Sequence, residues 1–192
     1  VGVRIRAGRC AFAEFDAPKL PETSGDLPAT ERLAGALGLI PSEIGFENHK
    51  PAIYTAGVPF AFVPVASMAA LARAVVNMQH WPHVFTGNVP QAAYLYTRET
   101  QHTTSAFRAR MFAPGMGVPE DPATGSAAAG LAGVIHRFDG LTDGSHRRVI
   151  EQGFEMGRPS LIVLSLEIDR GRLAAVRIGG HAVRVGEGRL SV

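Results

Sequence analysis

Residues 120–126, which we call the corner, are mostly small or polar, and in this segment a candidate helix start closely follows an acidic side chain. The stretch reads Glu120-Asp121-Pro122-Ala123-Thr124-Gly125-Ser126. The first N–H groups of a helix have no partner within it, and the helix dipole adds positive potential there. Gly125 has no side chain, so an anion could approach the backbone directly. The corner predicts a socket for a carboxylate-bearing substrate, with Asp121 beside it as an acid, a base or a hydrogen-bond acceptor.

Two elements must position this corner. Residues 107–112 alternate in the spacing of a strand, and a proline and glycines then break it. Thr124 and Ser126 are both suitable N-caps, and the small residues after them predict a helix from Ser126 to about His136. An ordinary capped helix after an Asp-Pro turn would show the same pattern. From the corner alone, that plainer interpretation is favoured.

Two contiguous motifs resemble the PhzF family, the phenazine-biosynthesis-like isomerases. The first combines Arg110-x-Phe-x-Pro with Gly117-Val-x-Glu-Asp-Pro-Ala-Thr-Gly-Ser-Ala127, and the second is Gln152-Gly-x-Glu-Met-Gly-Arg-Pro-Ser160. Weaker matches lie at residues 56–65 and 176–183. The resemblance covers essentially the whole chain, but it corresponds only to the later part of a family member.

The resemblance implies the diaminopimelate-epimerase-like fold, in which two half-domains each wrap a sheet around a helix and both helix starts face one cleft. Residues 21–180 would form the second half-domain. Residues 1–20 would be remnant strands of the first, and residues 181–192 a terminal strand that returns to it. The residues themselves predict the α+β class, with a bent, mostly antiparallel sheet around one central helix, because strands outnumber helices and are mostly linked as hairpins.

The resemblance also implies a chemistry. In the family, a glutamate from the first half moves a proton between carbons of a small cyclic or unsaturated carboxylic acid, without a metal or an organic cofactor. Asp121 and Ser126 match the assisting aspartate and serine, and Thr124, Gly125 and Ser126 would bind the substrate. Diaminopimelate epimerase has a thiol at the position of Thr124. An alcohol is far too weak an acid to replace that thiol as a carbon base, so a two-thiol racemase is disfavoured.

In the family, the first half carries the glutamate and a Gly-His-Pro segment. This chain contains no Gly-His-Pro segment, and the glutamate-bearing half has no counterpart here. A second hypothesis is therefore a truncated or split member that binds a ligand or a partner chain without catalysis. Glu43 lies in a segment that loosely resembles the glutamate segment, and we interpret it as a surface residue. Strands at residues 1–15 would leave unpaired edges, which predicts a homodimer or pairing with a missing N-terminal half.

Composition and charge narrow the class of protein to which this chain can belong. The 192 residues suffice for one sizeable domain or two small ones. A net charge of +2 without a Lys/Arg run argues against nucleic acid, and no apolar run is long enough for a membrane span. The single cysteine, Cys10, suits a buried apolar role and a cytoplasmic location. His80 and His83 lack further ligands at metal-site spacing, so no metal is expected.

Turn and cap signals give further local predictions. Asp26 is a candidate N-cap for a helix that ends at Gly38. Residues 84–87 are expected to form a strand. Gly179-Gly180 is predicted to be a two-residue hairpin turn that leads into a strand at residues 183–185.

Overall fold

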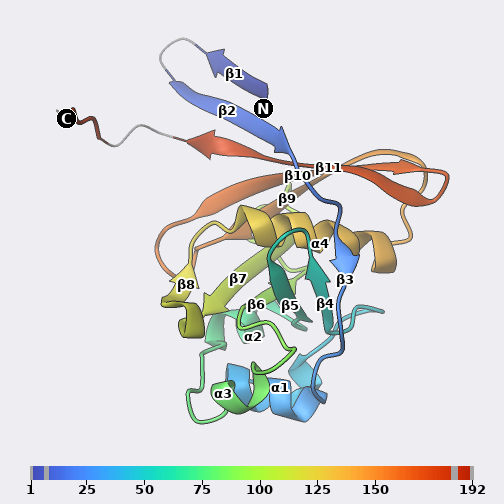
Figure 1. The fold of residues 1–192 in the computed structure, drawn as a ribbon, viewed down its shortest axis with the longest axis vertical. Coiled ribbons are helices and arrows are strands. Elements are labelled where there is room, and N and C mark those ends of the chain that lie inside the picture. Colours follow the sequence, from blue (N-terminus) through green and yellow to red (C-terminus); the bar gives the residue numbers. More distant parts are fainter. Residues whose placement is uncertain (1, 7–8, 183–185, 191–192) are drawn as a thin grey trace.

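One curled sheet contains all the strands of the structure (Figure 1). The structure is a computed structural model that describes residues 2–6, 9–182 and 186–190, and for residues 3–6 and 9–11 it describes the backbone alone. The strand order is β1-β2-β11-β10-β9-β7-β6-β5-β4-β3, and β8 pairs with β7 beside this path. Among the described residues, no helix is long and apolar enough to cross a bilayer.

The strands are β1 (Gly2–Arg6), β2 (Arg9–Asp16), β3 (Glu22–Thr23), β4 (Ala52–Thr55), β5 (Pro59–Pro64), β6 (Ala93–Thr97), β7 (Phe107–Ala113), β8 (Val118–Asp121), β9 (Gly144–Gln152), β10 (Ser160–Asp169) and β11 (Arg172–Ala182). The α-helices are α1 (Thr30–Leu37), α2 (Met68–Arg73), α3 (Trp81–Val84) and α4 (Gly125–Phe138). Two short 3-10 helices are η1 (Pro41–Glu43) and η2 (Pro114–Met116).

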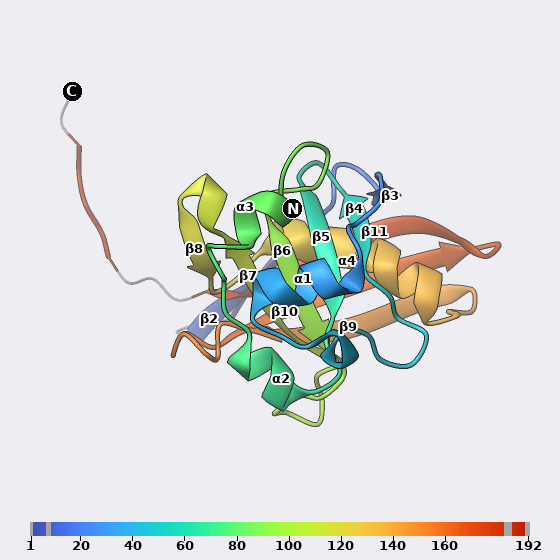
Figure 2. The same ribbon diagram turned by 90° about the horizontal axis from the view of Figure 1, so that it is seen from below.

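The sheet is mixed but mostly antiparallel, and it bends around α4. Only the pairs β5–β6 and β7–β9 are parallel, and the other named pairs are antiparallel. Helix α4 contacts β3, β4 and β5 on one side and β10 and β11 on the other, as Figures 1 and 2 show. The predicted α+β half-domain, a bent sheet around one central helix, is confirmed.

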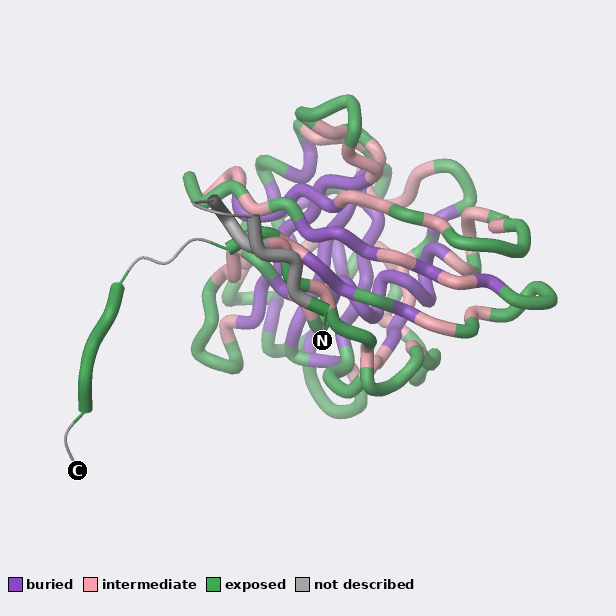
Figure 3. The backbone as a smooth tube through the Cα atoms, turned by 90° about the horizontal axis from the view of Figure 1, so that it is seen from above, coloured by how far each residue is buried: buried purple, intermediate pink, exposed green. Residues whose placement is uncertain are grey.

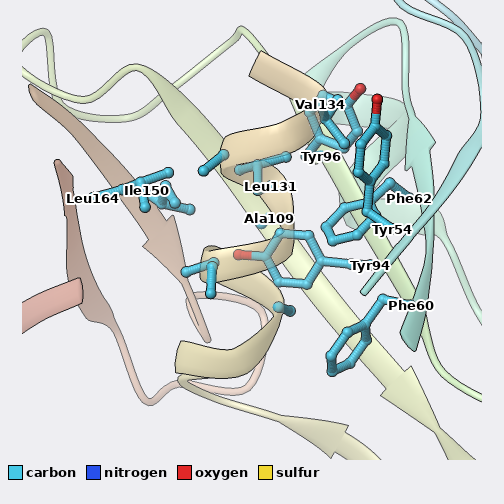
Figure 4. Close-up of a cluster of buried hydrophobic side chains, with 14 of the residues drawn as sticks. Tyr54, Phe60, Phe62, Tyr94, Tyr96, Ala109, Leu131, Val134, Ile150 and Leu164 are labelled. Carbon is cyan, nitrogen blue, oxygen red and sulfur yellow. The ribbon is translucent and has the colours of Figure 1, made fainter. Parts of the chain in front are cut away.

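The small residues of α4 let the sheet close around it. A Cβ atom at Gly133 would lie 2.5 Å from a ring carbon of Tyr54, and one at Gly130 would lie 2.7 Å from a ring carbon of Phe62. In Figure 4 these two rings lie on one side of the helix, and Ile150 and Leu164 lie on the other. The aromatic rings therefore fill the space that larger helix side chains would need.

Helices α1, α2 and α3 bury a second apolar cluster against the face of β5 and β6 that points away from α4. Figure 3 shows the buried residues concentrated in the central elements, with the loops exposed. Helix α1 ends at Leu37, and its C-cap, the predicted Gly38, is left-handed. The cap prediction at Asp26 is wrong: the helix begins at Thr30, and its N-cap is Ala29, which has no side-chain cap.

Two other local predictions are wrong, the first because of contacts within one helical turn and the second because of pairing with distant strands. Residues 84–87 form no strand: the Phe85 N–H donates to the Trp81 carbonyl, and the two rings stack with centroids 3.9 Å apart, which makes a helical turn. Gly179 and Gly180 lie inside β11, where Gly179 pairs with Val163 of β10 and Glu14 of β2. A Cβ atom at Gly179 would lie 2.6 Å from the Phe12 ring, so close cross-strand packing needs a glycine there. The predicted strand at residues 183–185 lies outside the described residues, and residues 186–190 are exposed without regular structure.

A buried polar cluster ties the end of α4 to the sheet. The two ring nitrogens of His49 lie 3.0 Å from the Tyr96 hydroxyl and 2.9 Å from Asp139 Oδ1. Arg98 donates to both oxygens of Asp139, at 2.6 and 3.2 Å. Burial alone would raise the pKa of the Asp139 carboxyl, but hydrogen bonds from His49 and Arg98 and the charge of Arg98 outweigh it and hold the pKa below its usual value.

Acid should therefore weaken the fold through this cluster. Because the folded-state pKa of Asp139 is lowered, its charged form stabilises the fold above about pH 4, and this contribution is lost as the pH falls through the folded-state pKa. We expect Asp139→Asn to cost about 1–3 kcal/mol at pH 7 and to flatten the acid limb of stability. Urea unfolding followed by circular dichroism between pH 2 and 7 measures both, and an unchanged acid limb in the variant would contradict the prediction.

Candidate active site

The corner that carries the candidate residues lies between β8 and α4. Asp121 is the last residue of β8 and pairs with Met111 of β7. Helix α4 begins at Gly125, one residue before the predicted start, and ends at Phe138 instead of His136. The chain turns between Asp121 and Gly125, which places the carboxylate beside the helix start.

Thr124 is buried, and its hydroxyl is directed to Asp121 instead of the helix. Its side chain makes no N-cap hydrogen bond. The Thr124 Oγ1–H donates to Asp121 Oδ2 over 2.6 Å. Among the described residues, no group donates to the other carboxylate oxygen, Oδ1. The threonine therefore fixes one oxygen of Asp121 and leaves the other available for a proton.

Gln152 holds this corner together, although the sequence pattern predicted no role for it. It is fully buried at the end of β9. Its Nε2 donates to the Asp121 carbonyl at 2.7 Å and to Thr124 Oγ1 at 2.8 Å. Its Oε1 accepts from the Thr124 N–H and from the Tyr94 hydroxyl, each at 3.2 Å. Gln152 opens the second motif, which was the available signal, but only the fold shows that this motif touches the first.

The Tyr94 hydroxyl is a permanent hydrogen-bond donor to Gln152. Burial, and then the negative charge of Asp121, raises the pKa of the Tyr94 hydroxyl well above its usual range. The hydroxyl therefore stays protonated and must donate to the amide oxygen. This fixes the orientation of the Gln152 amide, so that its NH₂ group faces Asp121 and Thr124.

The start of α4 has the free donors that an anion site needs. The N–H groups of Gly125, Ser126 and Ala127 have no acceptor among the described residues, whereas the Thr124 N–H is accepted by Gln152. Gly125 and Ala123 line a hollow of about 430 Å³, whose other wall is formed by residues 159–162 and 178–181. Ser126 is exposed at the helix start. Asp121 does not line this hollow; Thr124, its hydrogen-bond partner, directly precedes Gly125.

Arg110 and Glu120 of the first motif have a structural role, because they form an ion pair. The Arg110 guanidinium makes two hydrogen bonds to Glu120, at 2.8 and 2.9 Å. Its Nη1 donates to the carbonyls of Leu71 at 3.1 Å and Ala74 at 2.7 Å, at the end of α2. Arg110 thus joins β7, β8 and α2, and it satisfies carbonyl groups that a helix end leaves free.

The second motif packs directly on the corner at Gly153. This glycine has a φ of +79°, and a Cβ atom there would lie 2.3 Å from the Arg158 carbonyl oxygen and 2.8 Å from that of Pro122. Pro122 follows Asp121 in the sequence. The backbone around Gly153 therefore sets the position of the acidic corner.

Glu43 lies elsewhere in the fold. It ends η1, pairs with Arg73 of α2 and accepts the Ile40 N–H at 3.1 Å. The hydrogen bond from Ile40, and then the one from Arg73, lowers the pKa of the Glu43 carboxyl. It is absent from the lining of the hollow beside Gly125. Within the part of the chain that the structure describes, no three acidic, histidine or cysteine side chains gather as metal ligands.

A curled, mixed sheet around one helix matches the half-domain fold of PhzF-family structures. Residues 6–188 match the phenazine biosynthesis-like protein family (PhzC-PhzF), and the chain belongs to this family.

Named relatives and solved structures agree with this assignment. An uncharacterized isomerase of Mesorhizobium japonicum is 49% identical over 185 residues, which are 95% of this chain and 61% of that protein. A trans-2,3-dihydro-3-hydroxyanthranilate isomerase of Pseudomonas aeruginosa is 34% identical over 82% of this chain and 51% of its own length. The chain thus spans between half and about three fifths of these relatives.

A crystal structure of a PhzF-family phenazine biosynthesis protein of Bacillus anthracis superposes with a TM-score of 0.84. The superposition covers 99% of this chain and 64% of that one, at 20% sequence identity. At this identity the likeness shows the shared fold.

Proposed function

We propose that this chain carries the Asp121 half of a cofactor-independent isomerase that moves a proton between carbons of a small cyclic or unsaturated carboxylic acid. The named relative from Pseudomonas acts on such an acid, trans-2,3-dihydro-3-hydroxyanthranilate. A carboxylate from the other half takes a proton from one carbon, and a proton returns to another carbon. No electrons leave the substrate, so the reaction needs no redox group.

The observation that carries this proposal is the acidic corner beside unpaired helix donors. The N–H groups of Gly125 and Ser126 would bind the substrate carboxylate, and the Ser126 hydroxyl would add a donor. Asp121, held through Oδ2 by Thr124, would exchange a proton or accept a hydrogen bond through Oδ1. In this arrangement Thr124 contributes by orienting Asp121, because its own N–H donates to Gln152.

A second candidate function is ligand or partner binding without catalysis. It is favoured by the site itself, because free N–H donors adjoin the hollow beside Gly125 and Glu43 is absent from the lining of that hollow. On this view residues 1–20 and 181–192 would complete a first half-domain supplied by another chain, or the chain would pair with a second copy. For either function we propose the cytoplasm as the location, since the sequence has a single cysteine.

Complementation distinguishes the two functions. We would mix this chain with the part of the Mesorhizobium relative that it does not match, and follow solvent deuterium entering dihydro-hydroxyanthranilate and other small unsaturated acids by NMR. Isomerase function predicts exchange in the mixture and none in this chain alone. Ligand-induced shifts of the Gly125 and Ser126 amide signals without exchange, in a mixture shown to form a complex, would support binding alone and contradict the isomerase proposal.

A further inference from the structure

The buried Gln152 amide contacts two backbone groups at the acidic corner that each have only one possible hydrogen-bond role. The Asp121 carbonyl can only accept, and it lies 2.7 Å from Gln152 Nε2. The Thr124 N–H can only donate, and it lies 3.2 Å from Gln152 Oε1. Turning the amide over would place two acceptors together and two donors together in a buried site, which is costly. The backbone and the Tyr94 hydroxyl, which also donates to Oε1, therefore set the direction of the amide together.

The direction of this amide decides the direction of the Thr124 hydroxyl. Gln152 Nε2 also donates to Thr124 Oγ1 over 2.8 Å, so this oxygen is an acceptor and its own hydrogen must point elsewhere. Asp121 Oδ2, 2.6 Å away, is the one acceptor that the hydroxyl has among the described residues. Thr124 is itself buried. The donors in the series Gln152, Thr124, Asp121 therefore all point toward the carboxylate.

We propose that Gln152 is a positioning residue that acts through Thr124, keeping Oδ2 of Asp121 as an acceptor and confining proton exchange to Oδ1. This inference rests on the proposed isomerase function and adds to it the oxygen that carries the proton. An oxygen that accepts the Thr124 hydrogen holds no proton of its own toward that hydroxyl. Oδ1 has no donor among the described residues, so it is free to take a proton, which neutralises Asp121, and to release it again.

A double-variant cycle tests whether Gln152 acts through Thr124. We would measure the rate of solvent deuterium incorporation and the KM in the complemented protein for wild type, Gln152→Met, Thr124→Val and the double variant. Gln79→Met, at an exposed position between α2 and α3, is the matched control. Methionine has a similar length and no donor, so we expect Gln152→Met to lower the rate at least about 10-fold. The KM should stay within about 3-fold of wild type, because Gln152 makes no hydrogen bond to the N–H groups of Gly125 and Ser126.

The double variant carries the decisive result of this cycle. It should be at most about 3-fold slower than the slower single variant, because without the Thr124 hydroxyl the amide has nothing left to orient. Losses that multiply would overturn the proposal, since Gln152 would then act by another route. A rise in KM as large as the fall in rate would overturn it too, because it would indicate a purely structural role. Gln152→Glu has the same shape and, when charged, lacks the Nε2 donors; it replaces Gln152→Met in the same cycle if that variant does not fold.

A measurement on this chain alone separates the positioning role from the isomerase function. The NMR signal of the Asp121 carboxyl carbon reports the hydrogen bonds that this carboxylate accepts. We expect Gln152→Met to shift the signal in the same direction as Thr124→Val does, and Gln79→Met to leave it in place. A wild-type mixture without exchange would contradict the isomerase function, and this signal would then decide the positioning role by itself. A signal that moves in Thr124→Val but not in Gln152→Met would overturn the proposal.

Discussion

Alanine in place of Gly153 will destabilise the fold by about 4 kcal/mol or prevent folding altogether. The added Cβ atom would lie 2.3 Å from the Arg158 carbonyl oxygen and 2.8 Å from the Pro122 carbonyl oxygen. Both contacts are with backbone, so neither can move aside as the end of a flexible side chain would. The positive φ of +79° adds about 1–2 kcal/mol for any residue with a Cβ. Urea unfolding by circular dichroism, or the soluble yield where folding fails, measures the loss.

Gly171 provides the matched control. Its φ is +72°, nearly the same as that of Gly153, but a Cβ atom there would have nothing within 4 Å. Gly171→Ala should therefore cost only the backbone term, about 1–2 kcal/mol. Equal losses in the two variants would show that close packing of the second motif against Pro122 does not hold the corner. Because Gly153 follows Gln152, the same packing positions the residues around Asp121.

Asn in place of Asp121 should abolish proton exchange in the complemented protein while leaving the fold intact. General acid–base groups contribute about 10²–10⁴-fold to rates, and an amide cannot exchange a proton at neutral pH. The fold should persist, because an amide oxygen at position 121 can still accept the Thr124 hydroxyl hydrogen bond, 2.6 Å long in the wild type. The measurement is the initial rate of solvent deuterium incorporation, with thermal unfolding recorded for the same sample.

Asp169→Asn makes the same chemical change at an exposed residue at the end of β10, and it should leave exchange unchanged. Thr124→Val is the second useful variant. It removes the hydrogen bond that fixes Asp121 Oδ2 but keeps the carboxylate. We expect an intermediate rate, between those of wild type and Asp121→Asn. Exchange at the wild-type rate in Asp121→Asn would remove this residue from the chemistry, whatever its place beside α4.

Sequence alone determined the features that depend on neighbours in the chain. The alternation at residues 107–112 and the small residues after Thr124 predicted the strand and the helix at the acidic corner, and both form. Gly38 was predicted as a helix end for the same reason, because a left-handed residue with no side chain is a local requirement. The motif spacing was specific enough to indicate the family and its curled sheet around one helix.

Only the tertiary structure decided what depends on contacts between distant segments. Gly179-Gly180 has the composition of a hairpin turn, yet it continues a strand because β2, from the other end of the chain, and β10 pair with it on both sides. Gln152 is 28 residues from Thr124, and no local pattern could direct its amide to that corner. Local propensity acts over a few residues, whereas strand order and buried hydrogen bonds are fixed by the packing of the whole sheet around α4.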